Sequence, residues 1–256
     1  MRSSATVNRR TLVDYLDDYL EVGSIPDKSL NGLQVEGRGR IKRAAFAVDA
    51  CLRTIRTAAR YHADILIVHH GLFWSGNERI TGVMRERIAA LIESKMSLYA
   101  AHLPLDCHAE VGNNVQLARL LDLSVGKRFA DYHGVRIGYL AEADEPISRQ
   151  SFVARVEKAL RTKTDTLAFG PANIKRVGIV SGAASEFAAE ARDLGCQAFL
   201  TGETSHIAYH VAKEARINVV YAGHYATEAV GVKALADHLR RRFTLECRFV
   251  AAPTGY

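Results

Sequence analysis

The sequence predicts an α/β protein. Apolar runs of strand length alternate with segments whose apolar residues recur at helical spacing along nearly all of the 256 residues. Hydrophobic residues make up 48 % and charged residues 24 % of the chain, as in ordinary globular proteins with a sizeable core. No segment of 20–50 residues repeats, which excludes a solenoid.

The first half of the chain begins with a helix and then alternates. The helix is expected after Asn8, where Thr11 and Asp14 resemble a capping box. The run "DILIVHH" at 64–70 is almost wholly apolar before its two histidines, as in a buried strand. The other expected elements are strand 43–50, helix 52–62, helix 84–95, strand 97–106 with a turn at Pro104, and helix 113–123.

The second half follows the same style. The expected elements are strand 135–142, helix 149–161, strands 166–170 and 176–182, helix 185–195, strand 198–203, helix 205–216, strand 218–223, helix 227–243 and strand 245–252. A polar, glycine-containing stretch at Lys127–Gly134 indicates a domain boundary.

Net charge and cysteine content indicate which partners and which cellular location to expect. The net charge of +6 and the pI of about 9.2 favour anionic partners such as nucleotides or nucleic acid. The four cysteines are scattered and form no CxxC pair, which predicts reduced thiols and a cytoplasmic location. No apolar window approaches the roughly 18 residues of a membrane span, and the first residues lack a signal-peptide core.

Three expected strand exits carry side chains that bind metals. In α/β sheets, ligand sites gather beyond the carboxyl ends of the strands. These exits supply His69 and His70, His102 and Asp106, and His224 and Glu228. A mixed set of imidazoles and carboxylates of this size suits two metal ions held about 3.5–4 Å apart. The alternative is that each histidine is an ordinary polar residue at the end of a strand.

A rival pair of histidines occurs on an expected helix. His206 and His210 are four residues apart, but "HIAYH" lacks the glutamate of a zinc-protease motif. A helix surface or a subunit contact is the favoured interpretation there. Glu203, at another strand exit, could face the same cleft as the metal-type ligands. The chain contains neither a phosphate-binding P-loop motif nor a GxSxG motif.

Four motifs in order resemble one known family. They are "NGLQVEG" from Asn31, "HHGLFW" from His69, "HLPLDCHAEVGNN" from His102 and "GHYATE" from Gly223. With them, the chain resembles the dinuclear metal-centre family known as GTP cyclohydrolase I type 2, or Nif-three-like proteins. The resemblance implies that the metal ligands are His69, His70, Asp106, His224 and Glu228, with His102 at a pocket position.

The resemblance also implies an architecture. One α/β domain, residues 1–125 plus 221–256, would carry the ligands, and a second α/β domain, residues 126–220, would be inserted in it. The protomers would form a ring-shaped homo-hexamer with the metal pairs facing the interior.

The expected function is a dinuclear-metal hydrolase acting on a nucleotide, with GTP ring opening and formate release as the specific hypothesis. The cofactors would be two divalent ions per chain, for which Zn, Mn and Fe all suit such ligands. His102 and Glu228 are the candidate acid–base residues, while Phe73 and Trp74 either stack on a base or pack at the rim. The alternatives are a metal-dependent phosphoester hydrolase and a non-enzymatic, metal-containing ring that binds nucleic acid or a protein partner.

Overall fold

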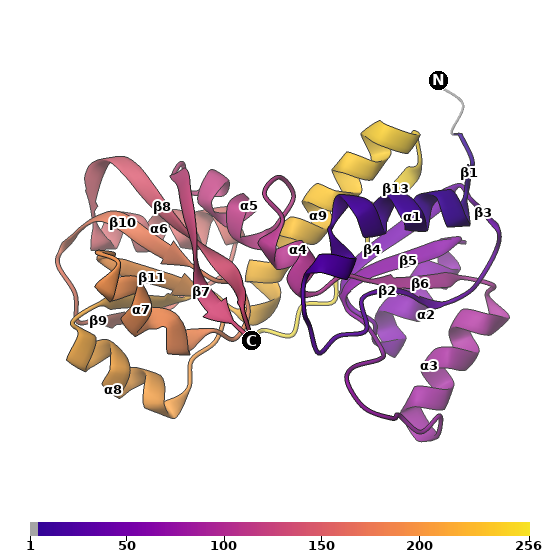
Figure 1. Ribbon diagram of the computed structural model, residues 1–256, viewed down its shortest axis with the longest axis horizontal. Coiled ribbons are helices and arrows are strands. Elements are labelled where there is room, and N and C mark those ends of the chain that lie inside the picture. The colour runs from indigo at the N-terminus through magenta and orange to yellow at the C-terminus, as the bar shows by residue number, and fades with distance from the viewer. Residues whose placement is uncertain (1–4) are drawn as a thin grey trace. The chain divides into compact units, whose positions relative to one another are not determined.

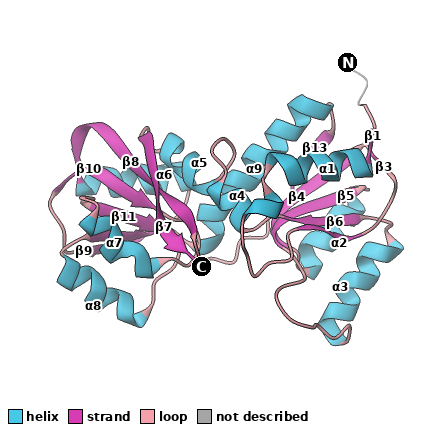
Figure 2. Cartoon of the chain, in the orientation of Figure 1, coloured by secondary structure: helices cyan, strands magenta, loops and turns pink. Residues whose placement is uncertain are grey.

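The computed structural model describes residues 5–256. The chain forms two compact units, each built around its own sheet (Figures 1 and 2). The first unit contains Met1–Leu105 and Val232–Ala252, and the second contains Asp106–Gly231 and Pro253–Tyr256. This composition confirms the α/β class.

A five-stranded sheet forms the centre of the first unit. Its order is β13–β4–β5–β6–β2, in which β13, β4, β5 and β6 are parallel and β2 is antiparallel to β6. The strands are β2 (Gly32–Val35), β4 (Arg43–Asp49), β5 (Ile65–His70), β6 (Ser97–Ala100) and β13 (Glu246–Phe249). A separate short pair joins β1 (Val7–Asn8) to β3 (Arg40–Ile41).

Helices cover both faces of this sheet, which explains why its strands are apolar on both sides. Leu66 and Val68 pack with α2 (Leu52–Arg60) and α3 (Gly82–Glu93), while α1 (Arg9–Tyr19) lies on the opposite side (Figure 1). A 3₁₀ turn, η1 (Val22–Ser24), follows α1. The side chain of Asn8 caps α1 by accepting from the Arg10 amide at 2.8 Å, so the expected capping box at Thr11 is wrong.

A six-stranded mixed sheet forms the centre of the second unit. Its order is β7–β8–β10–β11–β12–β9, and β10, β11 and β12 are parallel neighbours. The strands are β7 (Ser124–Tyr132), β8 (Val135–Ser148), β9 (Asp165–Ala168), β10 (Asn173–Ile179), β11 (Ala198–Thr201) and β12 (Asn218–Tyr221). The three parallel strands therefore end at the same edge of the sheet.

The helices of the second unit also lie on both faces. Phe152 of α6 (Arg149–Leu160) and Leu117 of α5 (Asn113–Leu120) share one core with Val177 of β10. The other helical elements are α4 (Leu103–Cys107), η2 (Ser185–Phe187), α7 (Ala188–Asp193), α8 (His206–Ala215) and α9 (His224–Phe243). Both α4 and α9 contain residues of each unit, because the chain passes between the units twice within a helix.

Several local expectations differ from the structure. Residues 127–134 are the end of β7 and its turn into β8, within the second unit. The expected turn at Pro104 is the short helix α4, and β2 and β7 have no expected counterpart. The chain passes from one compact unit to the other at Leu105/Asp106, Gly231/Val232 and Ala252/Pro253. Over the described part of the chain, no helix is long and apolar enough to span a membrane.

Candidate metal centre

Three histidines meet at the carboxyl ends of β5 and β6 in the first unit. His69 and His70 end β5, and His102 follows β6. Their ring centroids lie 4.7 Å (His69–His70), 5.0 Å (His69–His102) and 5.6 Å (His70–His102) apart. One ligand nitrogen from each ring lies within 4.8 Å of the others, close enough to hold a metal ion. We call these three side chains the histidine cluster.

Each imidazole of the cluster is anchored through Nδ1. His69 Nδ1 donates to the Ala101 carbonyl at 2.9 Å, and His70 Nδ1 to Asp49 Oδ1 at 2.8 Å. His102 Nδ1 bonds to both oxygens of Asp27, at 3.0 and 3.1 Å. A carbonyl or carboxylate accepts only, so Nδ1 is the donor in each of these bonds. Metal-binding histidines are held in this way.

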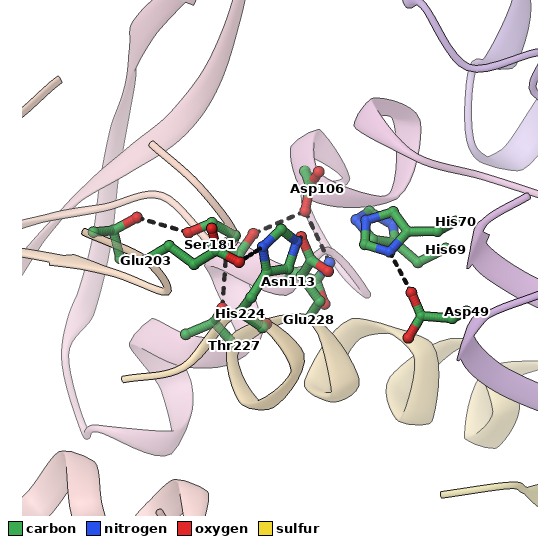
Figure 3. Close-up of polar contacts among 12 residues, drawn as sticks. Asp49, His69, His70, Asp106, Asn113, Ser181, Glu203, His224, Thr227 and Glu228 are labelled. Carbon is green, nitrogen blue, oxygen red and sulfur yellow. Dashed lines mark hydrogen bonds and ion pairs between the residues drawn. The ribbon is translucent and has the colours of Figure 1, made fainter. Parts of the chain in front are cut away.

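The register of β4 and β5 explains one of these anchors. Asp49 and His70 are paired residues of the parallel strands, so their side chains emerge on the same side of the sheet. Figure 3 shows the resulting contact. Asp49 had no role in the sequence prediction, although the strand exit "VDA" resembles the exits that supplied the histidines.

Residues of the motif around Asn31 hold the histidine cluster and the loop after β5 through hydrogen bonds. Asn31 Nδ2 donates to Asp27 Oδ2 at 2.9 Å, and Asn31 Oδ1 accepts from the His102 amide at 2.8 Å. Gln34 Oε1 accepts from the amides of Leu72 and Phe73 at 2.7 and 3.3 Å, which ties the loop after β5 to β2. Asp27, Asn31 and Gln34 had no individual role in the sequence prediction, although two of them belong to one of its four motifs.

Gly71 is required where this loop meets β2. A Cβ at Gly71 would lie 2.4 Å from Gln34 Nε2 and 2.7 Å from the Ala100 Cβ. The glycine therefore permits close approach rather than an unusual backbone angle. Two histidines are followed by glycine because the chain must turn tightly against Gln34.

A second cluster lies where β10, β11 and β12 end in the second unit. His224 Nδ1 bonds to Glu203 Oε1 at 2.6 Å, and His224 Nε2 lies 2.9 Å from Glu228 Oε1 (Figure 3). Because α9 begins at His224, Glu228 lies one turn further along the same helix, as the four-residue spacing predicts. We call His224, Glu228 and Glu203 the carboxylate cluster.

The two glutamates control the charge of His224. Burial alone would lower the pKa of this imidazole, but the hydrogen bonds and charges of Glu228 and Glu203 outweigh it and raise the pKa from 6.5 to about 9. A proton therefore sits between His224 and Glu228 at neutral pH in the metal-free protein. A metal ion binding at Nε2 must displace that proton.

Asp106 is held by the loop after β10. Its Oδ1 accepts from Asn113 Nδ2 and from Ser181 Oγ, both at 2.8 Å, and the residue is 7 % exposed (Figure 3). Ser181 is followed by Gly182, whose Cβ would lie 2.4 Å from Glu228 Oε1. One loop thus contacts both Asp106 and the carboxylate cluster. Asn113 and Ser181 are supporting residues that no sequence pattern singled out.

The donor chemistry fits divalent metal ions. Anchored imidazoles suit Zn, Fe or Mn, and buried carboxylates supply negative charge. Asp106 and Glu228 are 7 % and 3 % exposed, so both are largely desolvated. The structure brings together His69, His70 and His102 in one unit, and His224 with Glu228 in the other.

The remaining candidates from the sequence occupy different surroundings. His206 and His210 are exposed on α8, with ring centroids 6.0 Å apart, and belong to no group of three potential ligands found in residues 5–256. Trp74 meets the His102 ring edge-on at 5.0 Å and is half-buried. Phe73 packs against the core under α2 and α3, which favours the packing interpretation for that residue.

Comparison with known proteins agrees with the resemblance. Residues 7–254 match the model of the family described as "Duf34/NIF3 (NGG1p interacting factor 3)". A Pyrococcus abyssi protein named "GTP cyclohydrolase 1 type 2 homolog" is 47 % identical over 97 % of this chain and 100 % of its own length. A Deinococcus radiodurans protein of the same name is 42 % identical over 97 % of this chain and 95 % of its own length.

Solved structures agree as well. One titled "protein ybgI, unknown function" has a TM-score of 0.93 at 33 % identity and covers 98 % of this chain and 100 % of its own. The protein TTHA1606 from Thermus thermophilus has a TM-score of 0.87 at 39 % identity, with the same coverage. On its motifs, its fold and a match over residues 7–254, the chain belongs to the DUF34/NIF3 family.

Proposed function

We propose that this protein is a metal-dependent hydrolase that acts on a nucleotide, with GTP ring opening as the reaction. Two divalent ions per chain would be held by His69, His70, Asp106, His224 and Glu228. The architecture proposed with it is a first domain of residues 1–125 plus 221–256 that carries the ligands, an inserted domain of residues 126–220, and a homo-hexameric ring. These finer points rest on the family resemblance.

The observation that carries the proposal is the anchoring of the histidine cluster. Three neighbouring imidazoles each donate Nδ1–H to a fixed acceptor, and one ligand nitrogen of each ring lies within 4.8 Å of the others. Acceptors of this kind fix the tautomer and the orientation of histidines that bind metal ions.

Divalent ions bound to these residues would supply Lewis acidity and lower the pKa of water toward neutrality. Residues of the chain would transfer the protons. His102, with its proton fixed on Nδ1, would take a proton at Nε2 from the water that attacks C8 of the purine. His102 would then return that proton to the ring nitrogen as the C8–N9 bond breaks, and Glu228 is the second candidate proton shuttle. Hydrolysis of the resulting formamide would release formate.

Nucleotides are the favoured substrates for two reasons. The net charge of +6 attracts phosphates, and the relatives with 37–47 % identity carry the name "GTP cyclohydrolase 1 type 2 homolog". Trp74, half-buried beside His102, offers a flat surface to a base.

The test is a screen of metal-loaded protein against nucleotides with formate and free phosphate measured separately. Formate from GTP that is lost in His69→Ala and Asp106→Ala supports the proposal. His210→Ala is the matched control, because that histidine is exposed on α8 and should leave formate release unchanged. Phosphate without formate would point to phosphoester hydrolysis. Neither product, together with tight binding of nucleic acid or protein, would favour a non-enzymatic ring.

A further inference from the structure

Asp27 holds His102 through its ring and next to its backbone. The Asp27 carboxylate bonds to the ring Nδ1 of His102, and its Oδ2 accepts from the Leu103 amide at 3.0 Å. Asn31 bridges the two residues, donating to Asp27 and accepting from the His102 amide. Ring and backbone of His102 are thus fixed by a segment about 75 residues away in sequence.

Asp27 is buried and surrounded by hydrogen-bond donors. Its side chain is only 3 % exposed. Besides His102 and the Leu103 amide, it accepts from the Ser29 amide at 3.1 Å and from Asn31 Nδ2 at 2.9 Å. Both oxygens therefore act as acceptors at neutral pH, and the ring nitrogen that faces them must be the donor.

The three anchors of the cluster differ in kind. His69 bonds to a neutral backbone carbonyl, and the side chain of Asp49 behind His70 is 35 % exposed. Asp27 is the one buried anionic anchor among them. A buried carboxylate behind an imidazole fixes its tautomer and orientation and stabilises the ring after Nε2 gains a proton. This arrangement suits a histidine that accepts and releases a proton, the role proposed for His102.

We infer that Asp27 is a positioning residue that keeps His102 in its Nδ1–H tautomer, with Nε2 directed at the reaction. The inference rests on the proposed function for its catalytic consequence, but the tautomer itself does not. During turnover the proton of the attacking water would pass to His102 Nε2 and then to the leaving ring nitrogen. Asp27 would neither gain nor lose a proton.

The first test reads the tautomer directly. Long-range ¹H–¹⁵N NMR of protein labelled at the histidine rings would be recorded, with the His102 signals assigned by their absence in His102→Gln. The wild type should show the Nδ1–H form. In Asp27→Asn the amide can donate to Nδ1, so the Nε2–H form should replace it. Asp49→Asn is the matched control and should alter His70 while leaving the His102 signals in place.

The wild-type spectrum alone tests the tautomer of His102, even if Asp27→Asn fails to fold. An Nε2–H form of His102 in the wild type, or an unchanged tautomer in folded Asp27→Asn, would overturn the inference. Neither result depends on activity, so they are distinct from a failure of the proposed hydrolysis.

The second test uses the reaction. If GTP is opened, Asp27→Asn should lower kcat by about 10²–10⁴-fold with little change in KM, the usual worth of acid–base catalysis. His102→Gln should cost a similar factor, and the double variant should cost no more than either alone. Metal content should stay at the wild-type level in Asp27→Asn. Independent, multiplicative losses would show that Asp27 acts other than through His102.

Discussion

The substitution Gly182→Ala should disturb the carboxylate cluster through a single methyl group. Gly182 has φ of +68°, and an added Cβ would lie 2.4 Å from Glu228 Oε1 and 3.4 Å from His224 Nε2. Ordinary contact begins near 3.4 Å, so Oε1 must retreat by about 1 Å. That shift would break the 2.9 Å bond between Glu228 and His224.

Two contributions set the size of the effect. A Cβ in the left-handed region costs about 1–2 kcal/mol. Loss of a hydrogen bond between charged groups costs about 1.5–3 kcal/mol more. Gly182→Ala should therefore lower the free energy of unfolding by about 2.5–5 kcal/mol and reduce bound metal, because Glu228 leaves its position.

Gly134→Ala separates the two contributions. Gly134 has φ of +86° in the turn between β7 and β8, and its added Cβ would meet nothing within 4 Å. This variant should lose only the backbone cost of about 1–2 kcal/mol. Urea unfolding and elemental analysis of both variants provide the assay. Equal destabilisation and equal, undiminished metal content would refute the reasoning about Glu228.

The same site leads to three further predictions. Purified protein should carry about two divalent metals per chain by elemental analysis. His70→Ala and Glu228→Ala should lower that metal content, whereas the exposed control His133→Ala should not. In metal-free protein the pKa of His224 is raised from 6.5 to about 9 by Glu228 and Glu203, so its stabilising contribution is complete below pH 6.5 and is lost as pH rises through 9. Urea midpoints should fall over that interval and fall less in His224→Gln. Native mass measurement should give a closed homo-oligomer, and a monomer at micromolar concentration would contradict the expected hexamer.

Local patterns determined much of the fold and most of the ligand types. The apolar run of β5 and the four-residue spacing of His224 and Glu228 depend on neighbours in sequence, so each could be read without knowing the rest of the chain. Strand exits also singled out His69, His70 and His102, which lie together in the structure, because side chains that follow a buried strand emerge at a sheet edge whatever the order of the strands.

The sequence did not predict the two strands that form because they pair with a neighbouring strand. Strand β7, polar and half exposed, exists because it pairs with β8, and β2 because it pairs with β6. Their sequences lack a clear period of two, so the pairing energy rather than propensity selects the strand. The polar stretch at 127–134 therefore suggested a boundary where the chain makes a hairpin.

The tertiary structure alone identified the residues that make the ligands usable. Asp27 reaches His102 across 75 positions, Gln34 reaches Leu72 across 38, and Ser181 reaches Asp106 across 75. A long-range hydrogen bond has no sequence pattern, because it requires only that the fold bring the two atoms to about 3 Å, whatever residues lie between its partners. The sequence determined which side chains could bind metal, whereas the fold decided which carboxylates and carbonyls hold their imidazoles in one tautomer.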